Sequence, residues 1–208
     1  MILTPGCTIL FQGDSITDCQ RRSDPRGLGN GYPALVDAML TSAYPGMRVR
    51  VLNRGISGDR VRDLRARWTD DAIALQPDVL SILIGINDTW RRYDSGEATS
   101  ADAFAGDYDA ILARVKAETS AKLVLLEPFV LPCPPDREAW REDLDPKIAR
   151  VRQLAAKYEA VYIPLDGMLA SAGIAAGSWE RFAADGVHPT LVGHALIKNA
   201  FMSAVGMG

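Results

Sequence analysis

The sequence predicts an α/β protein built on a parallel sheet with helices on both of its faces. Two observations lead to this fold class. Short apolar runs rich in β-branched residues alternate with longer segments of helical period. The third of these runs, Val79–Ile84, is apolar at nearly every position, as expected of a central strand that is buried on both sides. The chain has 208 residues and no internal repeat, so we expect one domain over residues 1–208.

The predicted elements follow one another in a regular order. Strands are predicted at Thr8–Phe11, Val49–Leu52, Val79–Ile84, Leu123–Leu126 and Val161–Ile163. Helices are predicted at Tyr32–Thr41, Arg60–Leu75, Ser100–Glu118, Leu144–Tyr158 and Gly193–Val205. Each interval between strands therefore holds one helix candidate, and a last helix follows the fifth strand. Trp68 falls on the second helix at an apolar position, which favours a place in the core.

Composition excludes several classes of partner. The formal net charge is −3, and the basic residues are spread along the chain, so a nucleic-acid partner is not expected. No apolar run approaches the roughly 20 residues that cross a bilayer, so a membrane protein is not expected either. The three cysteines lack a C-x-x-C spacing, and a first strand at Thr8 leaves little room for a signal peptide. We therefore expect reduced thiols and a cytoplasmic protein.

Two long loops follow strands and indicate where a ligand binds. Asp18–Gly31 comes after the first strand, and the proline-rich Pro128–Asp143 comes after the fourth. Long irregular loops in compact domains are usually functional. Open parallel sheets bind ligands beyond the carboxyl ends of their strands, which is the edge from which both loops leave.

Segments at this same edge contain a possible nucleophile and its base. Ser15 lies in Gly13-Asp14-Ser15 directly after the first strand, where a turn would expose its hydroxyl. A serine hydroxyl attacks a carbonyl only when a base removes its proton. The chain has two histidines, and His188 is preferred because Asp185 stands three positions earlier and can orient the imidazole. His194 falls inside a helical pattern, which favours packing or capping.

Donors for an oxyanion are predicted after the second and third strands. Gly58, in Gly55-Ile56-Ser57-Gly58, can present its backbone N–H closely, and Asn87 offers a side-chain amide. The N–H of Ser15 would be a third donor. Each motif alone is more often a structural turn, but one such motif after each of several strands favours acyl transfer. A metal site is not expected, because no histidine stands at ligand spacing from the carboxylates. The G-x-S-x-G elbow of α/β-hydrolases is absent as well. Cys19 is expected to be a buried small residue rather than a nucleophile.

This ordered set resembles the SGNH (GDSL-type) hydrolases over nearly the whole chain. The matching positions are Ser15 in Gly-Asp-Ser, Gly58 in the second block, Asn87 in Gly-Ile-Asn-Asp, and Asp185 with His188 in Asp-x-x-His. The resemblance implies a flavodoxin-like three-layer fold with strand order 2-1-3-4-5 and no cofactor. It also implies a Ser15, His188 and Asp185 triad, with Ser15, Gly58 and Asn87 as oxyanion donors.

A closer resemblance is to intracellular bacterial acetylxylan esterases of this family. It is carried by Gly13–Cys19, Gly55–Gly58, the Val61–Trp68 helix segment, and Ile84–Asp88 with Trp90-Arg91. This resemblance implies O-acetyl groups on xylo-oligosaccharides or related carbohydrates. Aromatic side chains suit sugar rings, so the aromatic residues predicted to contact substrate are Trp90, Phe129, Trp140 and Trp179. Asp14, next to Ser15, is also predicted to contact substrate.

Two other functions remain open at this point. A lipid-directed esterase, such as a lysophospholipase, thioesterase or arylesterase, would need an extended apolar groove. A carbohydrate-binding protein without catalysis would not need the complete set of catalytic residues. The expected partner is a small-molecule or oligosaccharide ester, and the sequence leaves open whether the chain forms a homo-oligomer.

Overall fold

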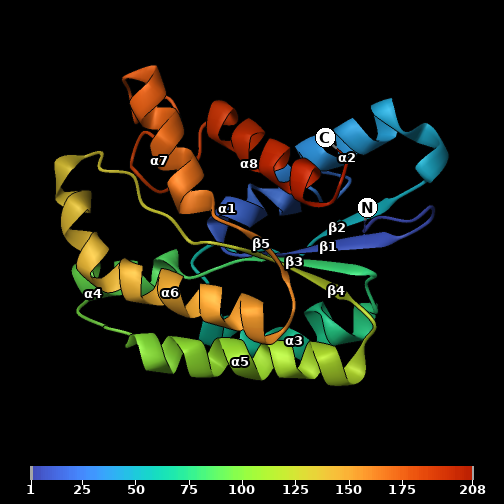
Figure 1. The fold of residues 1–208 in the computed structure, drawn as a ribbon, viewed down its shortest axis with the longest axis horizontal. Coiled ribbons are helices and arrows are strands. Elements are labelled where there is room, and N and C mark those ends of the chain that lie inside the picture. Colours follow the sequence, from blue (N-terminus) through green and yellow to red (C-terminus); the bar gives the residue numbers. More distant parts are fainter. Residues whose placement is uncertain (1, 208) are drawn as a thin grey trace.

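The computed structural model describes residues 2–207, and a five-stranded parallel sheet runs through its centre (Figure 1). The strand order is β2-β1-β3-β4-β5, which confirms the predicted order. The strands are β1 (Thr8–Gly13), β2 (Arg50–Asn53), β3 (Val79–Leu83), β4 (Lys122–Leu126) and β5 (Val161–Ile163).

Helices cover both faces of this sheet and complete the three-layer α/β/α fold. In Figure 1, α2, α7 and α8 lie on one side of the sheet, and α3, α5 and α6 lie on the other. The α-helices are α1 (Ser15–Asp18), α2 (Tyr32–Ala43), α3 (Val61–Asp71), α4 (Ile86–Asp94), α5 (Ala101–Glu118), α6 (Arg141–Lys157), α7 (Leu165–Ala176) and α8 (Leu191–Ala204). Short 3-10 turns are η1 (Arg21–Ser23), η2 (Pro45–Met47), η3 (Ile73–Leu75) and η4 (Pro135–Trp140).

Besides the single-turn helix α1, the sequence pattern missed helices α4 and α7, and each of these two has a physical reason. Helix α4 is short and mostly polar, and its Gly-x-Asn-Asp start has the composition of a turn. Helix α7 is made largely of small residues and buries only Leu165, Leu169 and Gly173, so its apolar period is weak. Helix α7 therefore lies between β5 and the turn that contains Asp185, where no helix was predicted.

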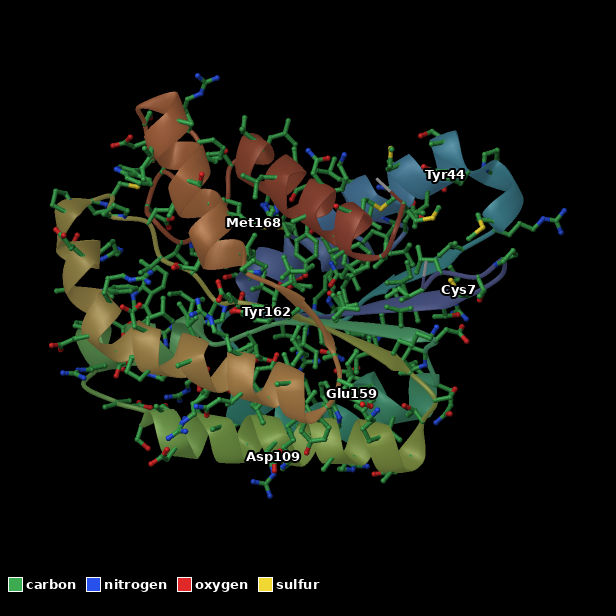
Figure 2. All side chains as sticks on the ribbon, viewed as in Figure 1. Cys7, Tyr44, Asp109, Glu159, Tyr162 and Met168 are labelled. Carbon is green, nitrogen blue, oxygen red and sulfur yellow. The ribbon has the colours of Figure 1, made fainter. Side chains whose placement is uncertain are left out.

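Both faces of the sheet are buried, as the apolar strands predict. Along β1, Ile9 and Phe11 join the core beneath α2 and α8, whereas Leu10 joins the core beneath α3 and α5. Trp68 is fully buried in the second of these cores. Side chains fill the spaces between the sheet and both helical layers (Figure 2). Within residues 2–207, no helix combines the length and the apolar character needed to cross a membrane.

The register of the sheet brings the segments after the strands to one edge. Gly13 pairs with Leu83, Leu83 with Leu126, and Leu126 with Ile163, so these strands end side by side. Strand β1 lies between β2 and β3, which is where the chain changes direction across the sheet. Crevices at such a switch point are the usual ligand sites of open α/β sheets.

Candidate active site

Ser15 begins helix α1 directly after β1, at this switch point. The turn requires Gly13, because a Cβ there would lie 2.3 Å from a backbone oxygen of β3 and 2.3 Å from Oγ1 of Thr17. Asp14 caps the helix by accepting a hydrogen bond of 3.0 Å from the N–H of Ile16. The local sequence thus turns the chain sharply and leaves Ser15 partly exposed beyond the end of the sheet.

Three side chains from the two ends of the chain form a continuous row of hydrogen bonds. Oγ of Ser15 lies 2.9 Å from Nε2 of His188, although 173 positions separate these residues. On the other side of the imidazole, Nδ1 lies 2.6 Å from Oδ2 of Asp185. The second carboxylate oxygen accepts the N–H groups of Val187 at 3.0 Å and His188 at 2.7 Å. This bonding selects the tautomer with the proton on Nδ1, which leaves the lone pair of Nε2 facing the serine hydroxyl.

The electrostatics of the pair suit an orienting carboxylate and a base. The hydrogen bond that Nδ1 of His188 donates to Asp185 raises the pKa of His188 above its ordinary 6.5, while partial burial opposes the rise. Burial alone would raise the pKa of Asp185, but the hydrogen bonds from the side chain and backbone of His188 and from Val187 lower it to about 2. The carboxylate is therefore charged at neutral pH, and it stabilises an imidazolium that forms when the imidazole accepts a proton.

The predicted oxyanion donors lie in two segments that are tied together. Asn87 is buried in the first turn of α4, and its Nδ2 donates to the carbonyl of Asp59 at 3.0 Å, which leaves its second N–H for another acceptor. Gly58, one residue before Asp59, is exposed and has φ of +88°, a conformation that favours glycine. Asp88 reaches the same segment, because its Oδ2 accepts the N–H of Val61 at 3.1 Å.

The segment after β2 is also held against the Ser15 turn. Asn53 donates through Nδ2 to the carbonyl of Thr17 at 2.6 Å and accepts the N–H of Gly55 at 2.9 Å. Ser57 donates its hydroxyl to Asp18 at 2.8 Å. These contacts link the turn that contains Gly58 to the turn that contains Ser15, and sequence reasoning did not identify them.

Comparison with known proteins identifies the kind of hydrolase. The sequence profile described as the GDSL-like Lipase/Acylhydrolase family matches residues 11–196. The chain belongs to this family. It is 36% identical over 218 residues to an acetylxylan esterase from Geobacillus stearothermophilus, which covers 99% of this chain and 97% of that protein. The predicted family and its acetylxylan esterase branch are therefore confirmed, and the chain is a carboxylic ester hydrolase.

Solved structures agree with the sequence comparison. An acetylxylan esterase from Geobacillus stearothermophilus superposes with a TM-score of 0.88 at 33% identity, over 100% of this chain and 98% of that one. An alpha/beta hydrolase enzyme from the metagenome of Lake Arreo, Spain, superposes with a TM-score of 0.90 at 32% identity, with the same coverage of both chains. These similarities to esterases argue against a carbohydrate-binding protein without catalysis.

The proline-rich loop of this GDSL-family esterase holds the turn that contains the Asp185–His188 pair. The N–H of Leu131 donates to the carbonyl of Gly186 at 2.8 Å, and Sγ of Cys133 donates to the carbonyl of Ala183 at 3.2 Å. Nε of Arg137 donates to the carbonyl of Asp185 at 3.2 Å. The loop was predicted to be functional from its length and its position after the fourth strand. In the structure it donates hydrogen bonds to the turn that contains Asp185 and His188.

Two of the aromatic residues predicted to contact substrate, Phe129 and Trp140, are buried inside the protein. Phe129 is fully buried, so it cannot reach a ligand from solvent, and that prediction is wrong. Trp140 is 3% exposed, because its ring stacks on Tyr93 at 5.2 Å and lies under the guanidinium of Arg137 at 4.2 Å. Trp140 is therefore also unsuited to contact a sugar. Only Trp90 approaches the site, with its ring 5.7 Å from the ring of His188 and partly exposed.

Trp179 lies in a different depression of the esterase surface. It packs on helix α7, where a Cβ at Gly173 would lie 2.1 Å from its ring. It borders a cavity of about 250 Å³ with Leu131 and Arg141, which does not include Ser15 or His188. The structure therefore gives Trp179 no place in the cavity beside Ser15 and His188, and its predicted contact with substrate stays a prediction.

Asp14 was predicted to contact substrate, but its carboxyl group faces the interior. It is 1% exposed, and burial raises its pKa to about 7 even though the N–H of Ile16 donates to it. Asp88 is equally buried, and burial raises its pKa to about 7 as well, opposed by the hydrogen bond from Val61. Both groups flank the site from below, so they act on the substrate only through the turns that they hold.

The esterase has a cavity of about 530 Å³ that opens beside the Ser15–His188 pair. Its walls come from α1, the Asp18–Gly31 loop, the Gly58 turn and the start of α8. None of the four predicted aromatic residues lines it. The lining residues are Ser15, Ile16, Cys19, Gln20, Asn30, Ser57, His188, Pro189, Leu191 and His194.

The second histidine and Cys19 form a neutral pair at the floor of this cavity. Nδ1 of His194 accepts the N–H of Tyr32 at 3.2 Å, and its Nε2 lies 3.2 Å from Sγ of Cys19. Burial lowers the pKa of His194 to about 4 and raises the pKa of Cys19 to about 12. Neither residue is charged at neutral pH, so the thiol is a poor nucleophile. Within residues 2–207, no group of three or more His, Cys, Asp and Glu side chains forms a metal site.

Proposed function

We propose that this esterase removes acetyl groups from hydroxyls of carbohydrates, with O-acetylated xylo-oligosaccharides as the substrate class. The observation that carries the catalytic part is the unbroken row of hydrogen bonds from Ser15 through His188 to Asp185. The substrate class is supported by the acetylxylan esterase relative and by the polar side chains of Gln20, Asn30 and Ser57 in the wall of the cavity. Structures of that relative include two described as catalytic mutants, one at a serine and one at a histidine.

In the proposed mechanism, His188 accepts the proton of Ser15 while the serine oxygen attacks the acetyl carbonyl. The tetrahedral intermediate carries a negative oxygen, which takes hydrogen bonds from the N–H of Ser15, the N–H of Gly58 and the free N–H of Asn87. The imidazolium, stabilised by Asp185, then gives its proton to the leaving sugar oxygen. Water repeats these steps on the acetyl-serine and releases acetate.

Replacing Ser15 by alanine tests the nucleophile. Hydrolysis of 4-nitrophenyl acetate should fall to the background rate, while the thermal unfolding midpoint stays close to that of the wild type. Activity retained by a folded Ser15→Ala variant would remove this residue from its role.

A panel of substrates tests the acyl group and the alcohol separately. We expect 4-nitrophenyl acetate to be preferred over the butyrate and octanoate esters, and acetylated xylo-oligosaccharides to release acetate. A preference for octanoate would instead identify a lipid-directed esterase, whose long acyl chain needs an apolar groove.

A further inference from the structure

The catalytic cavity does not end beside Ser15. A second cavity of about 310 Å³ adjoins it, because both are lined by Cys19, Gln20 and Asn30. The second cavity continues along the Asp18–Gly31 loop as far as Arg26. Together the two form a groove, which we call the loop groove, that starts at the catalytic hydroxyl.

The loop groove is too large for an acetyl group. Cavities of roughly 300–1,000 Å³ hold whole small-molecule ligands, and the catalytic cavity alone has about 530 Å³. His188 forms part of its wall, and Nε2 of that residue must deliver a proton to the leaving oxygen. The alcohol part of the ester therefore has to lie next to His188, which is where the groove begins.

The walls of the loop groove combine apolar surface with several polar side chains. Gln20 and Asn30 are both exposed and stand where the two cavities meet. Each side-chain amide offers two donors and one acceptor oxygen, which suits a ligand with several hydroxyl groups. Ser23, Asp24 and Arg26 continue this character in the outer cavity. A ligand with hydroxyl groups can hydrogen-bond to these side chains, whereas a long hydrocarbon chain would leave them without a partner in the ligand.

The backbone of the loop holds Gln20 in an unusual position. Cys19 and Gln20 have φ of +41° and +62°, the left-handed region that side chains other than glycine rarely adopt. Such conformations persist where the surroundings enforce them, and they are concentrated at functional sites. Gly29 and Gly31 let the returning part of the loop pack closely on this segment, because a Cβ on either would lie within 2.4 Å of Cys19.

Further hydrogen bonds make the loop rigid. Asp24 accepts the N–H groups of Arg26, Leu28 and Gly29 at 3.1–3.2 Å. Nδ2 of Asn53 donates to the carbonyl of Leu28 at 2.9 Å. The groove is thus shaped before a ligand arrives, and a preorganised site loses less entropy on binding.

We infer that the loop groove binds the polyhydroxylated alcohol of the ester, and that the side-chain amides of Gln20 and Asn30 hydrogen-bond to its hydroxyl groups. This inference rests on the proposed function, and it assigns the substrate to the Asp18–Gly31 loop rather than to the tryptophans. No change in the chemical step is involved, since the amides act on the part of the substrate that leaves.

The test compares two substrates that yield the same acetyl-enzyme. Because deacylation is common to both, the ratio of kcat/KM for an acetylated xylo-oligosaccharide to kcat/KM for 4-nitrophenyl acetate depends on the alcohol alone. The variants are Asn30→Ala and Gln20→Gly, the latter because glycine accepts φ of +62° without strain. The matched control is Asn199→Ala, which removes the same kind of amide from the exposed side of α8.

Each variant should lower this ratio roughly 2- to 12-fold, the range of one neutral hydrogen bond, mainly through KM. The double variant should lower it further, and Asn199→Ala should leave it within about twofold. An unchanged ratio in the folded double variant would overturn the inference, and so would a selective loss with 4-nitrophenyl octanoate, which would place an acyl chain in the groove. Failure of the proposed function looks different, because the wild type would then release no acetate from the acetylated xylo-oligosaccharide, whatever its rate with 4-nitrophenyl acetate.

Discussion

Replacing Asp185 by asparagine changes one oxygen of the proposed triad into an NH₂ group and keeps its size. The remaining carbonyl oxygen can still accept the N–H groups of Val187 and His188, now at 3.0 and 2.7 Å, so the turn keeps its shape. The new NH₂ group, however, faces Nδ1 of His188, which today lies 2.6 Å from a carboxylate oxygen. Nδ1 must then accept a hydrogen bond, and the imidazole proton moves to Nε2. In that tautomer the ring cannot take the proton of Ser15.

The expected loss follows from this tautomer change. In a serine protease the same replacement lowers kcat about 10⁴-fold, which corresponds to roughly 5 kcal/mol of transition-state stabilisation. We expect a loss of at least about 10³-fold here, since the hydrogen-bonding logic is the same. The pKa of His188 should also fall, because the hydrogen bond that it donates to the Asp185 carboxylate is the largest cause of its rise.

The assay is the pH profile of kcat/KM for 4-nitrophenyl acetate between about pH 5 and 9. The wild-type rate should rise with pH as His188 loses its proton, with a midpoint above 6.5. The pH profile of Asp185→Asn should have a lower midpoint, and its kcat/KM should be much smaller at every pH. The control is Asp102→Asn, whose side chain is 83% exposed at the start of α5 and should alter neither quantity. A folded Asp185→Asn variant that keeps more than about a tenth of kcat would refute the tautomer argument.

Three further predictions follow from the same geometry. Asn87→Ala should lower kcat about 10²–10³-fold with little change in KM, and a variant that changes only KM would show that the amide binds the ground state equally well. Arg137→Ala loses the hydrogen bond to Asp185 and the stacking on Trp140, so kcat should fall by up to about 10²-fold in a folded protein; full activity would mean that the loop holds the turn without this residue. Folding raises the pKa of His188, so its contribution to stability is complete below about pH 6.5 and is lost as the pH rises through the folded pKa. The difference in urea midpoint between the wild type and His188→Gln should therefore shrink from about pH 5.5 to 9, and a difference that grows would contradict the sign of the shift.

Local patterns in the sequence were sufficient for the sheet and for the order of the polar segments. Strand alternation and the apolar run at Val79–Ile84 depend on neighbours in the chain, and the structure has the predicted strands within one or two residues. The Asp185–His188 pair is readable for the same reason, since the carboxylate bonds to the backbone two and three residues later. Helices α4 and α7 were missed because their apolar faces are short or built from small residues.

Only the tertiary structure decided which side chains reach the substrate. Phe129 and Trp90 are both aromatic residues close to proposed site segments, yet one is fully buried and the other stands beside His188. The loop groove along Gln20 and Asn30 likewise has no signature in the sequence beyond a long loop. The reason is that periodicity reports contacts between near neighbours, whereas burial and cavity walls arise from segments up to 173 positions apart.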